Sequence, residues 1–512
     1  MAFKEDLITA RSYIVFIAGL LTAFAMVYYI EKQSAVKTQI PPVAMIKSVI
    51  PSERTPQATV ALQDNTVAVP VVETTTPEQA TTKVTTAIAT TAIAPKINPS
   101  PVASEMMADV SIQKTTVLAS VEAKTPSLSK HVKRSLTKEE QVWAKIAWQY
   151  FINNTQQNTG LVNSVHGYSA TTMWDTASYM MAAISAQRLA IISDTEFDTR
   201  MSSLLSSLAN MPLFDNKLPN KSYNTKTLAM VNYANKETAQ GIGWSAIDIG
   251  RILVPLKILQ SKYPQHKALV KQVLGRWSMT DVVHHGLMFG AVLDKKNEVR
   301  SLQEGRLGYE QYAAKTFNLF GYAAENAANY TTYLTYVDIY GIDVGVDKRD
   351  PKTNGAQNYV LSEPYILDGL EFGFDKSSKE LSSRLYLAQQ ARFKKTGILT
   401  AVSEDHIDVA PYFVYNTVYV AGKTWAAITD KGQDASAFKS LSTKTVFGWH
   451  ALYNTDYSAL MLKAVNTLNE PTKGWYAGLY EQTGKPNKAI TANTNGVVLQ
   501  SLAYIKYGKS LP

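Results

Sequence analysis

The chain has 512 residues, of which 46% are hydrophobic and 18% charged, enough apolar material for one large folded domain or two ordinary ones. Its formal net charge is +9 at pH 7, but Lys and Arg form no basic stripe and no zinc-finger motif occurs, which argues against nucleic acid as a partner. The sequence contains no Cys, which excludes disulfides, thiolate metal sites and a Cys nucleophile.

The N-terminal segment predicts a membrane anchor. Residues 1–11 form a short polar tail, and residues 12–30 run uncharged over the length that a helix needs to cross a bilayer. A cleaved signal peptide is the alternative, but the apolar run is long for one and no small-x-small cleavage site follows it. We therefore expect an uncleaved signal anchor, a single-pass protein of the inner membrane, with the tail in the cytoplasm and the C-terminal domain in the periplasm.

A change of composition separates this anchor from the folded part. Residues 31–137 are dominated by Thr, Ala, Val, Pro and Ser and contain no Trp, Tyr or Phe, which predicts a disordered linker. Aromatic residues return from Lys138 onward, and all eight Trp lie beyond that point. The function is therefore expected in residues 138–512.

A pattern recurs along this folded part. A loop rich in Gly, aromatic and acidic or Asn residues leads into a helix of small and apolar residues, and more polar helices such as 194–209 and 378–393 lie between these repeats. The repeats cover residues 171–186, 243–255, 308–320, 452–463 and 493–506. Pairing of a buried helix with a polar one predicts an all-α fold, an (α/α)6 barrel whose inner helices begin at one end. An open α-solenoid is the alternative.

Several catalytic motifs are missing from the folded part. It contains no P-loop, no dinucleotide-binding glycine fingerprint, no G-x-S-x-G nucleophile elbow and no H-E-x-x-H zinc motif. The adjacent pair His284 and His285 is explained more simply as a polar surface turn than as a pair of metal ligands. The sequence therefore predicts neither a metal nor a cofactor.

Carboxylates next to aromatic or glycine-rich loop residues indicate sugar chemistry. Cleavage of a glycosidic bond needs one carboxyl group as general acid and a second as base or nucleophile. Glu363 and Glu404 are the leading candidates for this pair, and Asp175, Glu310 and Asp405 are expected to position sugar or water. A structural alternative applies to Asp175 and Glu310, because an acid at a helix start also favours the positive end of the helix dipole.

Aromatic rings can cover the apolar faces of sugars, and polar side chains can bind the hydroxyls. Residues 403–416 combine the acidic group with aromatic residues and are expected to form one wall of a substrate groove. For any single aromatic residue a place in the core is the alternative, and Asp248 and Arg251 also fit an ion pair that faces the barrel lumen. The predicted substrate-binding residues are Trp174, Trp244, Asp248, Arg251, Tyr312, Tyr365, Tyr412, Tyr415, Asn416 and Trp475.

Five blocks of sequence resemble a known family of exported bacterial proteins. The blocks are Trp174-Asp-Thr-Ala-Ser-Tyr, Gly243-Trp-Ser-Ala-Ile-Asp-Ile-Gly-Arg, Gly308-Tyr-Glu-Gln-Tyr-Ala-Ala-Lys, Ser362-Glu-Pro-Tyr-Ile-Leu-Asp-Gly-Leu-Glu and Val402-Ser-Glu-Asp-His-Ile-Asp. They resemble the family catalogued as domain of unknown function 3131, which is similar to glucoamylase-like (α/α)6 enzymes. The resemblance spans roughly residues 139–508. It implies an envelope-located toroid of glycoside-hydrolase type, and it fixes neither the reaction nor the catalytic pair.

Three hypotheses on function remain open. The first is a membrane-tethered envelope glycoside hydrolase, or a transglycosylase, that acts on a bacterial polysaccharide or glucan. The second is a non-catalytic glycan-binding protein that assists a polysaccharide synthase or export complex. The third is a polysaccharide lyase with Tyr412 or His406 as its base. A hydrolase needs two carboxyl groups that face each other, a binding protein needs only the aromatic residues, and a lyase would act only on uronic-acid polymers.

Overall fold

A computed structural model describes residues 132–294, 296–349 and 357–511. The predicted tail (1–11), the predicted anchor (12–30) and the predicted linker up to residue 131 lie outside these residues. Among the helices of the described ranges, none is both long enough and apolar enough to span a lipid bilayer.

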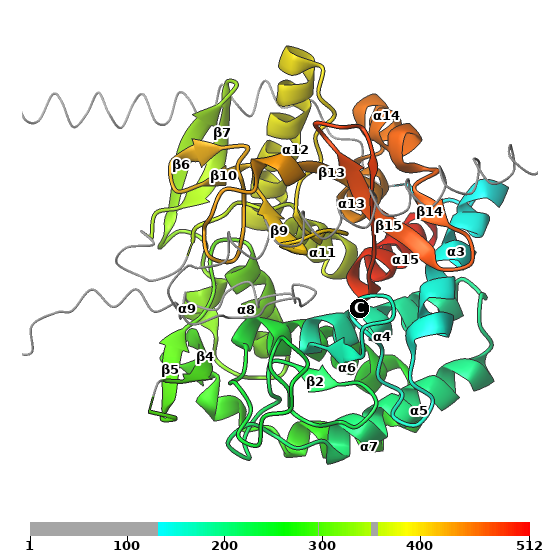
Figure 1. Cartoon of the computed structure of the whole chain (residues 1–512), viewed down its shortest axis with the longest axis vertical. Helices are drawn as coiled ribbons and strands as arrows, with labels where there is room; N and C mark the ends of the chain where they lie inside the picture. Colours follow the sequence, from blue (N-terminus) through cyan, green and yellow to red (C-terminus); the bar gives the residue numbers. More distant parts are fainter. Residues whose placement is uncertain (1–131, 295, 350–356, 512) are drawn as a thin grey trace, which may run out of the picture. The chain divides into compact units, whose positions relative to one another are not determined.

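Within the part of the chain that the structure describes, six helices form a closed ring. Each helix contacts the next one in chain order, and the last, coloured red in Figure 1, returns to lie beside the first. The closed ring agrees with the predicted barrel and not with an open solenoid. The ring helices are α4 (Met173–Arg188), α6 (Ala246–Lys262), α8 (Tyr309–Leu319), α11 (Glu363–Glu371), α13 (Thr443–Tyr453) and α15 (Ala492–Tyr507).

A second set of helices packs against the ring. Along the chain an outer helix precedes each ring helix, which produces the helical hairpins expected of an (α/α)6 barrel. Each outer helix also contacts at least one ring helix. The outer helices are α3 (Lys138–Asn154), α5 (Asp194–Asn210), α7 (Lys267–Gly275), α9 (Glu325–Ala328), α12 (Lys376–Thr396) and α14 (Asp456–Val465).

Small residues allow the ring helices to approach closely. A Cβ added to Gly250 of α6 would lie 2.5 Å from the Cβ of Ala313 on α8, and one added to Gly496 of α15 would lie 2.8 Å from the carbonyl oxygen of Ser178 on α4. These contacts leave no room for a larger side chain, because buried atoms are already packed at near-crystalline density. The small-residue repeats in the sequence therefore mark helix-to-helix contacts of the ring.

One repeat was placed on the wrong helix. The predicted small-residue helix at 452–463 spans the junction of α13 and α14, and the ring helix is α13, whose residues are almost all buried. Asn454 ends α13 in a left-handed conformation, and Thr455 starts α14 by accepting a hydrogen bond from the Ser458 amide. Asn at a helix end and Thr at a helix start are preferred for these roles, so the boundary is visible in the sequence.

Short antiparallel sheets, which the all-α prediction omitted, occupy the connections between helices. Their strands are β1 (Ala170–Thr171) with β2 (Tyr223–Asn224); β3 (Val283–His284), β4 (Leu287–Leu293) and β5 (Val299–Gln303); β6 (Leu334–Ile339) with β7 (Ile342–Asp347); β8 (Glu404–His406), β9 (Phe413–Asn416) and β12 (Ala427–Ile428); β10 (Tyr419–Val420) with β11 (Lys423–Thr424); and β13 (Ser440–Ser442), β14 (Asn469–Glu470), β15 (Gly474–Tyr480) and β16 (Pro486–Ile490). Single turns of 3-10 helix cover Pro264–His266, Met279–Asp281 and Ser436–Phe438. Two of these sheets, β8–β9–β12 and β6–β7, carry residues of functional interest.

Candidate active site

The first turns of several ring helices meet at Glu363, the first residue of α11. Its Oε1 atom accepts hydrogen bonds from Trp174 Nε1 of α4 at 3.1 Å and from Asn493 Nδ2 of α15 at 2.8 Å. The ammonium group of Lys444, in the first turn of α13, binds the other oxygen. These contacts bring the N-terminal ends of α4, α11, α13 and α15 together around one carboxyl group.

Lys444 also joins Glu363 to two acids on strand β8. Its Nζ atom lies 3.6 Å from Asp405 Oδ1 and 4.0 Å from Glu404 Oε1. Because an oxygen of each carboxyl group lies within 4.0 Å of this nitrogen, no two of these oxygens are separated by more than twice that distance. This limit admits the separation of about 5 to 5.5 Å of retaining glycoside hydrolases and only the lower part of the range of about 6.5 to 9.5 Å of inverting ones.

Two hydroxyl groups hold Glu404 in place. Tyr309, the first residue of α8, donates to Oε1, and the neighbouring Ser403 donates to Oε2 at 2.9 Å. The ring of Tyr309 in turn meets Trp174 edge-on, with centroids 5.4 Å apart. Helix α8 therefore contributes its first residue as well, in addition to the four ring helices whose N-terminal ends meet at Glu363. We call Glu363, Glu404, Asp405 and Lys444 the carboxyl cluster.

The proton affinity of Asp405 differs from that of an ordinary aspartate. Burial raises the pKa of its carboxyl group from 3.8 to about 7, and the negative charge of Glu363 acts in the same direction. The positive charge of Lys444 opposes this rise without cancelling it. The carboxyl group of Asp405 thus retains a proton close to neutral pH, which is the property that a general acid requires.

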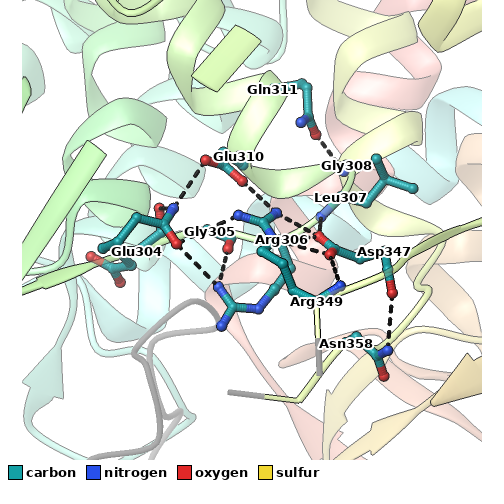
Figure 2. Close-up of polar contacts among 11 residues, drawn as sticks. Glu304, Gly305, Arg306, Leu307, Gly308, Glu310, Gln311, Asp347, Arg349 and Asn358 are labelled. Carbon is teal, nitrogen blue, oxygen red and sulfur yellow. Dashed lines mark hydrogen bonds and ion pairs between the residues drawn. The ribbon is translucent and has the colours of Figure 1, made fainter. Parts of the chain in front are cut away.

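Glu310 belongs to a neighbouring network of charges at the start of α8 (Figure 2). Its Oε2 atom accepts from Arg349 Nη2 at 2.6 Å and its Oε1 atom from Gln303 Nε2 at 3.0 Å. Arg349 Nε also lies 2.9 Å from Asp347 Oδ1, at the end of β7. Burial raises the pKa of Glu310, while Arg349 works against that rise. This network fixes the position of Glu310 relative to strand β7.

Asp175 and Asp248 occupy equivalent positions, each the third residue of a ring helix. The amide of Asp175 donates to the Thr172 hydroxyl at 3.1 Å, and the amide of Asp248 donates to the Ser245 hydroxyl at 3.1 Å. The Thr172 hydroxyl also donates to Asp175 Oδ2 at 2.9 Å. Both acids are buried, so each lies within the capped first turn of its helix. Their predicted contact with sugar remains a prediction.

Arg251, on ring helix α6, is fully buried and pairs with Glu371, whereas the sequence predicted an ion pair with Asp248. Its Nη1 atom is 2.5 Å from Glu371 Oε1 and 2.8 Å from the hydroxyl of Tyr312, and both charged side chains are fully buried. The Tyr312 hydroxyl donates to Glu371 Oε2 at 2.6 Å, and the guanidinium carbon of Arg251 lies 5.6 Å from the Trp174 ring centre. Sequence reasoning missed Glu371, although its spacing of eight residues from Glu363 on α11 places the two acids near the same face.

All three predicted tryptophans lie in the hydrophobic core, and Trp174 is the one that also contacts Glu363. Trp244 is 3% exposed and donates from Nε1 to the carbonyl of Phe289 at 3.0 Å. Trp475 is fully buried, packs edge-on against Phe447, and donates from Nε1 to the carbonyl of Trp143 at 3.1 Å. Each indole nitrogen is thus satisfied within the protein.

The predicted residues of the β8–β9 region lie on β9, which pairs with the strand of Glu404 and Asp405, or in the loop before it. Tyr415 pairs with Glu404 across the two strands and stacks on Tyr359, with ring centres 4.3 Å apart. Asn416 donates to the carbonyl of Ser440 at 2.9 Å, at the start of β13. Tyr412, in the loop between β8 and β9, is half-buried.

Tyr365 lies in the contact between the starts of α8 and α11. A Cβ added to Gly308, at the N-terminus of α8, would lie 3.3 Å from the Tyr365 ring and 3.0 Å from Pro364. Gly308 also has φ +97°, which a larger residue rarely adopts. This glycine therefore allows the first residues of α8 and α11 to meet.

Sequence reasoning missed Lys444, Asn493 and Tyr309. The signal that could have found them is their position, because each lies among the first two residues of a ring helix, as do Trp174 and Glu363. Lys444 was hidden in the apolar run of α13, where a lysine is expected to be buried only when paired. A helix-by-helix alignment of the ring starts would have shown these residues together.

The closed helical ring defines a class of fold that solved glycan-active proteins share. Similar structures include a candidate glucoamylase from Bacteroides caccae (TM-score 0.51, 10% identity, covering 72% of this chain and 93% of that one). An endo-β-1,2-glucanase from Chitinophaga pinensis in complex with sophorotriose and glucose is also similar (TM-score 0.51, 10% identity, 73% and 94% covered). So is an endo-β-1,2-glucanase from Talaromyces funiculosus with bound β-1,2-glucan (TM-score 0.50, 10% identity, 73% and 84% covered). At these identities the likeness establishes the shared (α/α)6 fold.

The chain belongs to the family described as "Protein of unknown function (DUF3131)", whose match covers residues 142–508. The resemblance expected from the five sequence blocks is thereby confirmed. Among curated proteins, none matches the sequence of this chain.

Proposed function

We propose that the chain is a glycoside hydrolase, or a transglycosylase, that acts on a polysaccharide through carboxyl groups at the N-terminal end of its helical ring. The observation that carries this proposal is the gathering of Glu363, Glu404 and Asp405 around Lys444 Nζ. Acid and base catalysis of glycoside cleavage needs two carboxyl groups in different protonation states within a short distance.

Asp405 takes the role of general acid. Its pKa of about 7 keeps the proton available at the pH at which most carboxyl groups have lost theirs. In the reaction it would donate that proton to the glycosidic oxygen as the bond to the departing sugar breaks. The Lys444 ammonium near Oδ1 would then stabilise the carboxylate that remains.

Glu363 takes the role of base or nucleophile. Donors from Trp174, Asn493 and Lys444 contact its two oxygens, and such donors favour the ionised form of a carboxyl group. An ionised carboxylate opposite a protonated acid either activates water or attacks the sugar carbon itself.

Glu404 is the second candidate for the general acid. With Asp405 as the acid, Glu404 orients the substrate. It accepts hydrogen bonds from Tyr309 and Ser403, so both of its oxygens already have a donor. The sequence favoured Glu404 before Asp405 as the partner of Glu363. The raised pKa of Asp405 supports reversing that order.

Two observations support hydrolysis over the other hypotheses. A lyase needs a cation for the carboxylate of a uronic acid, whereas Lys444 is already occupied by three carboxyl groups of the protein. A binding protein needs only aromatic rings for the sugar, and it would not require three acids to gather around one ammonium group.

The substrate class rests on the solved structures of similar fold. Two of them hold β-1,2-linked glucose oligomers or β-1,2-glucan, which makes a neutral β-glucan the first substrate to test. The predicted anchor at residues 12–30 supports a position beside the inner membrane, with residues 138–512 in the periplasm. A polysaccharide synthase or export complex would then be a neighbour of the enzyme.

The test is product release by the full chain. The chain is incubated with β-1,2-glucan, a β-1,3-glucan, cellulose and a uronic-acid polymer, and the soluble oligosaccharides are separated by chromatography. Release of oligosaccharides from a neutral glucan supports the proposal. Unsaturated products from the uronic-acid polymer alone would identify a lyase, and retention of the chain on a glucan without any product would identify a binding protein.

A further inference from the structure

Hairpin β6–β7 carries an unusual pair of side chains. Tyr336 is 41% exposed and Tyr340 is 36% exposed, and within the described residues every other Phe, Tyr and Trp is less exposed than these two. Both tyrosines lie on the same hairpin, Tyr336 in β6 and Tyr340 in the turn that follows it. Neither belongs to the carboxyl cluster or to the residues that hold it.

The backbone conformation at the hairpin tip disfavours an aromatic residue. Tyr340 has φ +58° and is followed by Gly341 at φ +80°, in a two-residue turn between the paired residues Ile339 and Ile342. Such turns favour Asn or Gly at the first position, because a larger side chain is strained there. Residues held in costly backbone conformations cluster at functional sites. An exposed tyrosine at this position therefore suggests a role for its side chain outside the fold.

Helix α12 and a neighbouring loop support the two rings from within the protein. The guanidinium carbon of Arg384 lies 5.5 Å from the centre of the Tyr336 ring, and Lys395 Nζ lies 5.0 Å from that of Tyr340. The Tyr340 ring is also nearly parallel to Trp425, with an interplanar angle of 16° and centroids 6.1 Å apart. These contacts restrict the rings before any ligand arrives, which lowers the entropic cost of binding.

The base of the hairpin is fixed as well. Asp347 at the end of β7 accepts a hydrogen bond from the Leu307 amide at 3.0 Å, and Arg349 binds both Asp347 and Glu310 (Figure 2). Strand β7 packs closely on α12, since a Cβ added to Gly345 would lie 2.5 Å from Leu381. The hairpin is thus anchored at both its base and its inner face.

The polar groups around Tyr336 indicate a neutral ligand with hydroxyl groups. Arg384 forms a 3.0 Å ion pair with Glu380, so the cation near the ring is balanced by a carboxylate. The exposed acid Asp338 lies on the same strand, two residues from each tyrosine. Donors and acceptors of both signs beside an aromatic ring match the hydroxyls and the apolar C–H face of a sugar. A surface for anionic lipid headgroups would instead show an excess of cations.

We propose that Tyr336 and Tyr340 form a second glycan-binding site, a surface platform that holds a neutral polysaccharide outside the carboxyl cluster. The two residues are roughly 13 Å apart along the hairpin, a span that a linear oligosaccharide of a few sugars can bridge. The platform would raise the local concentration of a long polymer, in the manner of a second binding module. The proposal rests on the proposed function in that the ligand is a glycan, but it does not require catalysis.

The test measures binding and cleavage separately with the full chain. Retardation in native gels that contain β-1,2-glucan or β-1,3-glucan gives an apparent Kd for the wild type, Tyr336→Ala, Tyr340→Ala and the double variant. Each single substitution is expected to weaken binding by roughly fivefold, from the loss of one aromatic contact. Leu460→Ala, which removes an exposed apolar side chain on α14, is the matched control and is expected to bind like the wild type.

Cleavage of a short oligosaccharide is expected to stay unchanged in the double variant, because a short substrate gains nothing from a remote platform. Full binding by the double variant would overturn the inference, and so would failure of the wild type to be retarded by either glucan. Tyrosine-dependent binding to vesicles that contain phosphatidylglycerol, without retardation by glucans, would show a membrane surface instead. Retardation that depends on the tyrosines, without any cleavage, would support the glycan-binding platform and contradict the proposed hydrolase. Cleavage without retardation would support the hydrolase and contradict the platform.

Discussion

Lys444 and Glu363 form a buried ion pair that joins the first turn of α13 to the first residue of α11. The same ammonium group also lies within 4.0 Å of an oxygen of Asp405 and of an oxygen of Glu404, both on strand β8. Carboxyl groups this close would repel one another if all were ionised, so the cation and a retained proton make their proximity possible.

The first prediction concerns the pH dependence of activity. A general acid must be protonated to act, so kcat/KM on a cleaved glucan should fall as pH rises through the pKa of Asp405, about 7. Steady-state rates measured from pH 5 to 9 would check this. An activity that stays constant up to pH 9 would contradict the role of Asp405 as the acid.

The second prediction concerns Lys444→Met. The Lys444 charge lowers the pKa of Asp405, so its removal should move the alkaline fall in kcat/KM to higher pH while reducing the maximal rate. Lys257→Met is a suitable control, because Lys257 lies in the C-terminal half of α6, where it donates to the carbonyl of Leu319. A Lys444→Met profile with an unchanged alkaline limb would show that the ammonium does not act on the acid.

The third prediction is a gain of stability in Asp405→Asn. The folded-state pKa of Asp405 is raised above its usual value of 3.8, so the folded protein binds this proton more tightly than the unfolded chain does. Ionisation of Asp405 therefore costs stability progressively as pH rises from about 4 to 7, and the cost is complete above that range. At pH 8 Asp405→Asn should unfold at a higher urea concentration than the wild type. The gain in the free energy of unfolding should be a few kcal/mol at most, on the order of the linkage to the pKa shift.

At pH 4 most of that advantage should be gone, because Asp405 is then protonated in the folded state and lies close to its usual pKa of 3.8 in the unfolded chain. Equilibrium unfolding of the two proteins at both pH values gives the comparison. If Asp405→Asn were less stable than the wild type at pH 8, the carboxylate would be stabilising and the assigned direction of its pKa shift would be wrong.

The fourth prediction tests the buried pair inside the ring. Glu371→Gln leaves the fully buried Arg251 without its charge partner, which should cost about 3 to 5 kcal/mol of unfolding free energy. The double variant Arg251→Met with Glu371→Met should cost less than the single substitution, because no uncompensated charge remains. Urea denaturation of the three proteins measures both effects. A Glu371→Gln protein with wild-type stability would show that the pair does not stabilise the ring.

The helical ring was predictable because its requirements are local. Small residues recur where ring helices touch, as Gly250 and Gly496 do, and capping residues such as Thr172 and Ser245 mark the helix starts. The short sheets were not predictable from periodicity, since most strands between the helices are too short to show a clear alternation of polar and apolar residues.

Part of the candidate site was predictable for the same reason, and part was not. Glu363, Glu404 and Asp405 stand beside aromatic residues in the sequence, and the fold brings them together. Lys444 and Asn493 carry no such local signal, since their importance arises only when distant helix starts converge. The buried positions of Trp244 and Trp475 depend on carbonyl groups elsewhere in the chain that accept from their indole nitrogens.

The most direct test of the account is the activity of Glu363→Gln and Asp405→Asn on the glucan that the wild type cleaves best. Both substitutions keep the shape of the side chain and remove its acid–base function, and Glu325→Gln, an exposed acid at the start of α9, is the matched control. Each site variant is expected to lose at least about 100-fold in kcat while remaining folded, and the control is expected to retain full activity. If both folded site variants release oligosaccharides at the wild-type rate, the carboxyl cluster is not the catalytic site.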